Sequence, residues 1–149
     1  MTRPLQLHGT CVARGADGVL ILGPPGAGKS DLALRLIGKG FVLVADDRVD
    51  IATDRNTGVL ASAPLASRGL LEVRGLGIVR LPFRPDAVLR VVVDLTQPPE
   101  RMPEPMTHPV LGLPLLHLDA RGASAADWVA LALDCATGAA EQIAGAFRA

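Results

Sequence analysis

The chain has 149 residues, which suggests one domain, and 49% are hydrophobic but only 3% aromatic, so aliphatic side chains must build its core. Fifteen basic residues balance fifteen acidic ones, which excludes a general field for nucleic acid or an anionic membrane and makes any phosphate binding local. No apolar run reaches the length of about 18 residues that spans a bilayer, and no signal peptide is evident, so we expect a cytoplasmic, single-domain protein over residues 1–149.

The first part of the chain predicts a hairpin, a helix and a buried strand. Residues 10–13 and 19–22 read as strands joined around the turn 15–18, where an Asp-Gly pair is a strong hairpin signal. Apolar residues then recur at helical spacing over 32–37, and the glycines that follow are expected to end this helix. The continuous apolar run 41–45 is typical of a strand buried on both faces.

The second part predicts another hairpin, a second buried strand and a final helix. Residues 49–51 and 58–61 read as a short hairpin, and 88–95 as a buried strand. The segment 97–109 carries five prolines, so we expect an exposed irregular loop. A helix starts near Ser124. Its expected apolar face consists of Trp128, Leu131, Ala132 and Cys135.

A glycine-rich signature for phosphate binding lies between the second predicted strand and the first predicted helix. The pattern Gly-x-x-x-x-Gly-Lys-Ser is specific in this context. Glycines let successive N–H groups point at phosphate oxygens, and the helix adds the positive end of its dipole. The lysine places a cation on the β- and γ-phosphates, and the serine offers a hydroxyl to Mg²⁺. The predicted binding residues for ATP are Gly23, Pro24, Pro25, Gly26, Ala27, Gly28, Lys29 and Ser30.

Two acidic segments are candidates for the carboxylate that such a metal site usually needs at the end of a neighbouring strand. Asp46 and Asp47 follow the strand at 41–45, and Asp94 lies in the later buried strand. The first pair is better placed, because one short helix separates it from Lys29 and its strand can lie beside the strand that enters the loop. Since successive side chains point apart, one acid can address the metal or the lysine and the other the nucleophile.

His8 reaches the phosphate loop if the first hairpin continues to its position. If Arg14 pairs with Val19, His8 lies opposite Pro25. Pairing Ala16 with Val19 instead moves His8 two residues further along the loop. In either register the imidazole is expected near the phosphates.

Spacing alone does not decide whether Glu72 and Arg101 have a function. Glu72 lies in the segment 70–79, which is apolar but broken by two glycines, and it is either a solvent-facing strand residue or a buried ligand. Arg101, in the proline-rich loop, is either a solvated charge or a mobile cation that reaches a site.

Four motifs together resemble the HPr kinase/phosphorylase family in order and approximate spacing. They are His8-Gly9-Thr10, the phosphate loop at 23–30, Val44-Ala45-Asp46-Asp47-Arg48-Val49 and Leu71-Glu72-Val73-Arg74-Gly75-Leu76-Gly77-Ile78. The resemblance is strong over 5–80 and looser over 81–135. It implies ATP-dependent phosphorylation of a serine on HPr, a small phosphocarrier protein of the sugar phosphotransferase system. It also implies the reverse phosphorolysis, in which inorganic phosphate takes the group and pyrophosphate is released.

The resemblance also implies roles for individual residues. Asp47 accepts the proton of the substrate serine and returns it in the reverse direction, and Arg101 matches the arginine of a Glu-Arg-Leu site motif. The catalytic set is therefore His8, Lys29, Asp47 and Arg101. The resemblance assigns Mg²⁺ to Ser30 and Glu72, and the argument from the acidic pair adds Asp46.

The implied fold is an α/β P-loop domain with a mixed sheet, similar to the nucleotide core of phosphoenolpyruvate carboxykinase. The predicted hairpin agrees, since a parallel doubly wound sheet would need a helical crossover there. Family enzymes assemble as hexamers, and this chain resembles their short form. A loop linked to dephosphorylation, roughly Arg-Pro-Gly-Arg-Asn in longer members, reads Arg121-Gly122-Ala123-Ser124-Ala125 here. Kinase activity is therefore expected to exceed phosphorylase activity.

Two other functions are alternatives. A small-molecule kinase of the shikimate or nucleoside monophosphate type needs an arginine-bearing lid, and the loop 97–109 offers one arginine. A nucleotide-sensing adaptor would bind ATP without turnover, but it has no need of His8 and the acids at 46, 47 and 72. Neither nucleic acid nor a membrane is expected as a partner.

Overall fold

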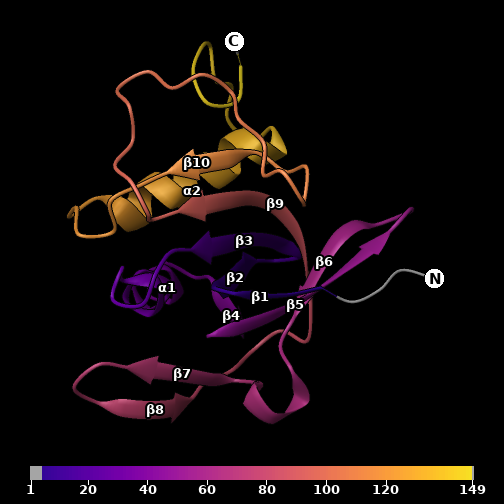
Figure 1. Ribbon diagram of the computed structural model, residues 1–149, viewed down its shortest axis with the longest axis vertical. Helices are drawn as coiled ribbons and strands as arrows, with labels where there is room; N and C mark the ends of the chain where they lie inside the picture. Colours follow the sequence, from indigo (N-terminus) through magenta and orange to yellow (C-terminus); the bar gives the residue numbers. More distant parts are fainter. Residues whose placement is uncertain (1–4, 149) are drawn as a thin grey trace.

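The computed structural model describes residues 5–148, which form a mixed eight-stranded sheet, two α-helices and a separate hairpin (Figure 1). The strands of the sheet are β1 (Leu5–His8), β2 (Thr10–Arg14), β3 (Asp17–Leu22), β4 (Val42–Ala45), β5 (Arg48–Asp54), β6 (Gly58–Ser62), β9 (Ala87–Asp94) and β10 (Leu115–His117). The helices are α1 (Lys29–Ile37), α2 (Ala125–Thr137) and the short 3₁₀-helix η1 (Leu65–Ser67). The separate hairpin consists of β7 (Leu70–Val73) and β8 (Gly77–Arg80).

Strands β3, β4, β9 and β10 run in one direction, and their carboxyl ends lie at the same edge. β9 is parallel to β3, and β10 is parallel to β9. β4 is antiparallel to β2, which is antiparallel to β3, so β4 also runs with β3. The strand before the acidic pair was expected directly beside the strand that enters the phosphate loop, and this is wrong because β2 lies between them. The four carboxyl ends still share one edge, where α/β sheets commonly bind ligands.

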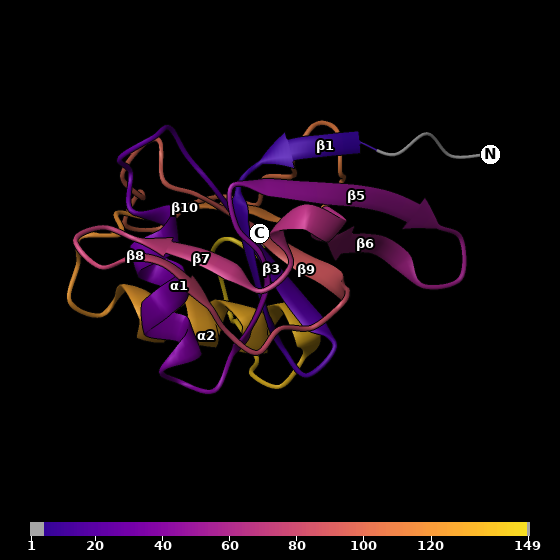
Figure 2. The same ribbon diagram turned by 90° about the horizontal axis from the view of Figure 1, so that it is seen from below.

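Both helices cover the same face of the sheet, and β1 and β5 lie over the other (Figure 2). Leu36 of α1 and Leu133 of α2 share a buried cluster with Val19 and Ile21 of β3. The intervening Leu20 belongs to a second cluster, which contains residues of β5 and β6. This alternation is required of a strand that is buried on both faces.

β9 changes its pairing partner near Arg90. Its first residues pair with β6 and its last residues pair with β10, while β3 lies along its other side. The register with β3 shifts there: Gly18 lies opposite Leu89 but Val19 lies opposite Val91, so Arg90 is an extra residue. A bulge bends a strand and increases its twist. The sheet therefore curls at this point, and β10 takes the place of β6 beside the end of β9.

The first hairpin forms as expected, but in another register. Arg14 pairs with Asp17, so the turn consists of Gly15 and Ala16 and neither expected pairing of Val19 occurs. Gly15 has a positive φ of 61°, which a two-residue hairpin turn favours at glycine. The prediction failed because the Asp-Gly pair that suggested the turn lies inside β3 instead.

His8 was expected opposite the phosphate loop, and this is also wrong, because strand pairing places it elsewhere. The chain bends at Gly9, and β1 pairs with β5, where His8 lies opposite Arg48. A Cβ at Gly9 would lie 2.9 Å from both the carbonyl oxygen of Ile21 and Cδ2 of Leu22. Only glycine fits this corner without displacing its neighbours. The bend carries His8 toward the acidic pair.

The remaining predicted elements are largely confirmed. α1 ends before Gly38, β5 and β6 form the second hairpin, and β9 is the second buried strand. β10 was missed, because three residues are too few to show a strand pattern. α2 begins after Ser124 as expected. Its buried residues are Ala125, Ala126, Val129, Ala132 and Leu133. The expected apolar face was therefore only partly right, since Leu131 is 57% exposed.

Two further properties follow from the described residues. Neither α-helix among them has the length and apolar content needed to cross a bilayer. Cys11 and Cys135 are free thiols. Complete burial raises the pKa of the Cys11 thiol to about 12, so it stays protonated and unreactive at neutral pH.

Replacing Gly9 by alanine is expected to lower the free energy of unfolding by about 1–3 kcal/mol, because the added Cβ forces the backbone of β3 to shift. Denaturant unfolding measures this change. Gly122→Ala is the matched control, since its nearest neighbour, the carbonyl oxygen of Asp119, would lie at an ordinary 3.6 Å. Equal stability of the two variants would contradict the proposed corner.

Candidate functional site

The glycine-rich loop between β3 and α1 has the backbone that phosphate binding requires. Gly23, Gly26 and Gly28 have φ angles of 157°, 83° and 98°, which side-chain-bearing residues rarely adopt. Lys29 Nζ donates hydrogen bonds to the carbonyl oxygens of Gly23 at 2.7 Å and Pro24 at 3.2 Å. The ammonium group therefore lies across the loop whose N–H groups are expected to face the phosphates.

The Asp46 carboxylate is the centre of a buried polar network. Its side chain accepts hydrogen bonds from the Thr10 hydroxyl at 2.8 Å and from the Ser30 hydroxyl at 2.9 Å, both at Oδ1. Its Oδ2 accepts the backbone N–H of Glu72 at 3.2 Å. Thr10 is fully buried and Asp46 is 8% exposed. The first residue of the acidic pair thus contacts the serine of the phosphate loop, although its strand is not the neighbour of β3.

The predicted metal residues fit Mg²⁺ in part. Ser30 and Asp46 supply adjacent oxygen atoms, the ligand type that Mg²⁺ prefers. A carboxylate offers about four lone-pair positions, and three at Asp46 are already used, which leaves one for a metal or a metal-bound water. The Glu72 side chain is exposed on β7. Within residues 5–148, no group of three or more His, Cys, Asp or Glu side chains is arranged to hold a metal ion.

Asp47 differs from its neighbour in both conformation and exposure. It is the one non-glycine residue among those described that has a positive φ, 72°, and its side chain is exposed. Aspartate tolerates this left-handed conformation better than most residues. Its carbonyl oxygen accepts the N–H of Gly9 at 3.1 Å. His8, also exposed, pairs with Arg48, so the histidine and the second acid lie close together beside the network.

Asp94, the alternative acid, has another role. It ends β9 opposite Leu22, next to the phosphate loop. Its carboxylate accepts hydrogen bonds from the backbone N–H and the hydroxyl of Thr96. The side chain caps the turn that follows β9, which favours Asp46 for the phosphate-loop serine.

A pocket of about 460 Å³ lies beside the phosphate loop. Its walls are residues 24–28, Asp31, the segment 95–98 after β9 and the segment 118–121 after β10. Arg121 donates from Nε to Asp119 Oδ1 at 3.1 Å and from Nη2 to Oδ2 at 3.2 Å. These hydrogen bonds lower the pKa of the Asp119 carboxyl. Sequence reasoning did not single out this aspartate.

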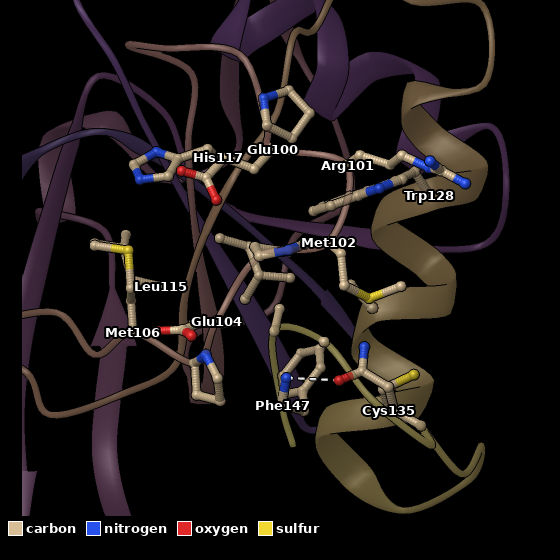
Figure 3. Close-up of a pocket in the computed structure, with 18 of the residues that line it drawn as sticks. Glu100, Arg101, Met102, Glu104, Met106, Leu115, His117, Trp128, Cys135 and Phe147 are labelled. Carbon is tan, nitrogen blue, oxygen red and sulfur yellow. Dashed lines mark hydrogen bonds between the residues drawn. The ribbon is translucent and has the colours of Figure 1, made fainter. Parts of the chain in front are cut away.

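A larger pocket of about 960 Å³ lies between the proline-rich loop, β10, α2 and the C-terminal segment (Figure 3). Arg101 lines this pocket at the same end as Trp128. Arg101 does not line the smaller pocket, and within the described part of the chain no hydrogen bond or salt bridge joins it to the phosphate loop. The structure therefore brings together Lys29, Ser30 and Asp46, with His8 and Asp47 nearby, but not Arg101.

Sequence reasoning also missed Thr10. This residue belongs to the His8-Gly9-Thr10 motif, but a threonine in a predicted strand gives no local sign of a partner. Its partner, Asp46, lies 36 residues away in the chain. The one signal in the sequence that could have indicated Thr10 is its place in the motif, directly after Gly9.

Comparisons with known proteins agree with this geometry. The family model described as the HPr Serine kinase C-terminal domain matches residues 1–94. An HPr kinase/phosphorylase of Acidovorax sp. (strain JS42) is 40% identical over 124 residues, which cover 74% of this chain and 39% of that protein. One of Latilactobacillus sakei subsp. sakei (strain 23K) is 47% identical over 74 residues, 50% of this chain and 24% of that protein. The chain thus spans two fifths or less of the length of these relatives.

A solved structure shows the same fold. The chain superimposes on the structure of the Hpr(Ser) kinase/phosphatase from Coxiella burnetii with a TM-score of 0.72. The match covers 87% of each chain at 23% sequence identity. The mixed, curled sheet and its two covering helices are therefore an arrangement that occurs in that protein as well.

Replacing Thr10 by valine is expected to lower the free energy of unfolding by about 1.5–3 kcal/mol, because a buried carboxylate loses one hydroxyl donor while the side-chain shape is kept. Urea unfolding measures the loss. Thr10→Ser is the control, since it keeps the donor and removes only a methyl group. A valine variant more stable than the serine variant would show that the hydrogen bond contributes little.

Proposed function

The chain belongs to the family of the HPr kinase C-terminal domain, and on that premise we propose that it transfers the γ-phosphate of ATP to a serine of an HPr-like phosphocarrier protein. The division between the two adjacent acids after β4 carries this proposal. Asp46 is buried and accepts the Ser30 hydroxyl, whereas Asp47 is exposed beside it. One acid thus orders the phosphate end of the site, and the other faces the solvent from which a protein substrate approaches.

The phosphates bind to the glycine loop in this proposal. The N–H groups of residues 23–28 and the start of α1 donate to the phosphate oxygens, and Lys29 exchanges the carbonyl oxygens of Gly23 and Pro24 for the β- and γ-phosphates. Bound Mg²⁺ neutralises charge on those phosphates. Ser30 and Asp46, which contact each other, would hold the metal ion. Glu72, whose N–H already binds Asp46, is the further candidate ligand.

Asp47 is the proposed general base for the attacking serine. Phosphoryl transfer needs the nucleophile in line with the leaving group and a carboxylate that accepts its proton. Asp47 has a left-handed backbone and an exposed side chain, whereas Asp46 is buried in its network, and this difference supports a separate role. His8 lies beside it through the pairing of β1 with β5 and is proposed to assist. Arg101 enters this proposal only if the proline-rich loop moves toward the phosphate loop, since it lines the other pocket.

The family resemblance supports the wider setting of the proposal. It suggests a cytoplasmic enzyme that acts on the sugar phosphotransferase system, with a nucleotide core like that of phosphoenolpyruvate carboxykinase. It also suggests assembly into a hexamer. Incubation with ATP, Mg²⁺ and HPr, read by intact mass, tests the activity directly: HPr should gain the mass of one phosphoryl group. Binding of ATP without this gain would support the nucleotide-sensing adaptor instead.

Replacing Asp47 by asparagine is expected to preserve binding of ATP with Mg²⁺ and to lower the rate of phosphoryl transfer by about 10²–10⁴-fold, the usual contribution of a positioned base. Calorimetry and the HPr mass assay measure the two properties separately. Lys29→Ala is the comparison variant, since it should lose nucleotide binding while the fold remains intact. If Asp46→Asn abolishes turnover and Asp47→Asn is mild, the two acids have exchanged roles.

Phosphorolysis is expected to be slower than phosphorylation. The reverse reaction brings inorganic phosphate close to a phosphoserine, so several cations must offset the repulsion between two anions. In the segment 121–125, Arg121 is the one arginine, and Asp119 already pairs with it. Phosphorylated HPr with millimolar phosphate and Mg²⁺ should therefore release pyrophosphate slowly, as a coupled assay measures. A phosphorolysis rate above the forward rate at matched saturation would refute this expectation.

A further inference from the structure

The order of groups along the ligand-binding edge of the sheet defines a direction for a bound nucleotide. Asp46 and Asp47 follow β4, the phosphate loop follows β3, and the segments 95–98 and 118–121 follow β9 and β10. These four strands run in the same direction, and in the sheet β4 and β9 lie on opposite sides of β3. The acids and the pocket of about 460 Å³ therefore lie on opposite sides of the phosphate loop.

This direction leaves one place for the nucleoside. The γ-phosphate must lie on the side of Asp46, because Ser30, the metal-binding residue of the loop, contacts that carboxylate. The other end of the nucleotide then leaves the loop toward β9 and β10. The pocket there has a volume within the range of about 300–1,000 Å³ that is usual for small-molecule sites.

The wall of this pocket is positioned from the helix that starts at the phosphate loop. Arg35 of α1 donates hydrogen bonds to the carbonyl oxygens of Ala120 and, at 3.1 Å, Gly122. A Cβ placed on Gly28 would lie 3.3 Å from the Cβ of Ala120. The phosphate loop and the segment 118–121 are thus held against each other.

The pocket has no aromatic ring on which a base can stack. The chain contains no tyrosine, one tryptophan and three phenylalanines, and all four rings lie within the described residues. Phe41 is in the core, and Trp128 and Phe147 line the other pocket. Phe83 forms a bridge with Leu43 of β4, on the far side of β3. The wall does contain the flat cationic guanidinium of Arg121.

We propose that the nucleoside of ATP occupies this pocket and that its base stacks on the Arg121 guanidinium, which two hydrogen bonds to Asp119 orient. The paired hydrogen bonds from Nε and Nη2 to the two oxygens of Asp119 occupy one of the edges with which an arginine can bind a phosphate. The side chain of Arg121 is 89% exposed, so its flat face is open to a ligand. Guanidinium groups stack on aromatic faces, whereas an ammonium group has no plane to offer.

The proposal rests on the proposed function, in which ATP is the donor, and isothermal titration of the full chain tests it. ATP and tripolyphosphate are compared as ligands in the presence of Mg²⁺. In Arg121→Ala, the affinity for ATP should fall by about 2- to 5-fold, as for a cation–π contact at an exposed site, and the affinity for tripolyphosphate should not change. Arg121→Lys keeps a cation but not the flat guanidinium, so its affinity for ATP should lie between those of the wild type and the alanine variant, with the affinity for tripolyphosphate unchanged. Arg55→Ala, which removes an equal charge in the turn between β5 and β6, should leave both affinities unchanged.

Each alternative result overturns the proposal in a distinct way. If Arg121→Ala weakens tripolyphosphate as much as ATP, Arg121 binds phosphate and not the base. If Arg121→Ala changes neither affinity, the nucleoside lies elsewhere. HPr phosphorylation by the wild-type protein separates this failure from that of the proposed function. If Arg121→Ala weakens ATP but not tripolyphosphate, and the wild-type protein does not phosphorylate HPr, the nucleoside site is supported and the proposed kinase activity is refuted.

Discussion

The carboxylate of Asp46 is the constraint on which the rest of the site depends. It is almost completely buried, and it accepts hydrogen bonds from three segments that are distant in the chain: β2 through Thr10, α1 through Ser30, and β7 through an amide. A buried carboxylate is costly unless it is fully hydrogen-bonded. If any of the three segments moves away, the buried carboxylate loses a hydrogen bond and the folded state is destabilised. The β7–β8 hairpin forms a sheet of its own, and this amide links it to α1 through the Asp46 carboxylate.

The second constraint is the common direction of β4, β3, β9 and β10. Because their carboxyl ends share one edge, groups from very different parts of the sequence meet there without any long connection. The corner at Gly9 serves the same edge, since it lets β1 leave the hairpin and place His8 beside Asp47. The extra residue at Arg90 lets β10 pair with the end of β9 and bring its following loop to the pocket. Two small irregularities, at Gly9 and Arg90, thus bring His8 and the loop after β10 to this edge.

Some of these features were predictable because they depend on neighbours in the sequence. The phosphate loop is one continuous segment, and its glycines, lysine and following helix obey local rules. Asp46 was placed near the phosphate loop for an incorrect reason, since β2 separates the two strands that could have been adjacent. The register of the first hairpin was wrong, because a strong turn signal lay inside a strand while a less usual Gly-Ala pair formed the turn. Local propensity is a weak guide when tertiary packing selects the register.

The sequence by itself determined the phosphate-binding loop, most of the strands and both helices, and the family that the motifs indicate, because these depend on composition, period and short spacing. Only the tertiary structure decided which side chains meet. It joined Thr10 to Asp46, placed Arg101 in another pocket, and gave two adjacent aspartates different surroundings, the first buried and the second exposed with a left-handed backbone. Such contacts depend on strand order, register and close approach at glycine, and these are set by the packing of the whole chain and not by any one segment.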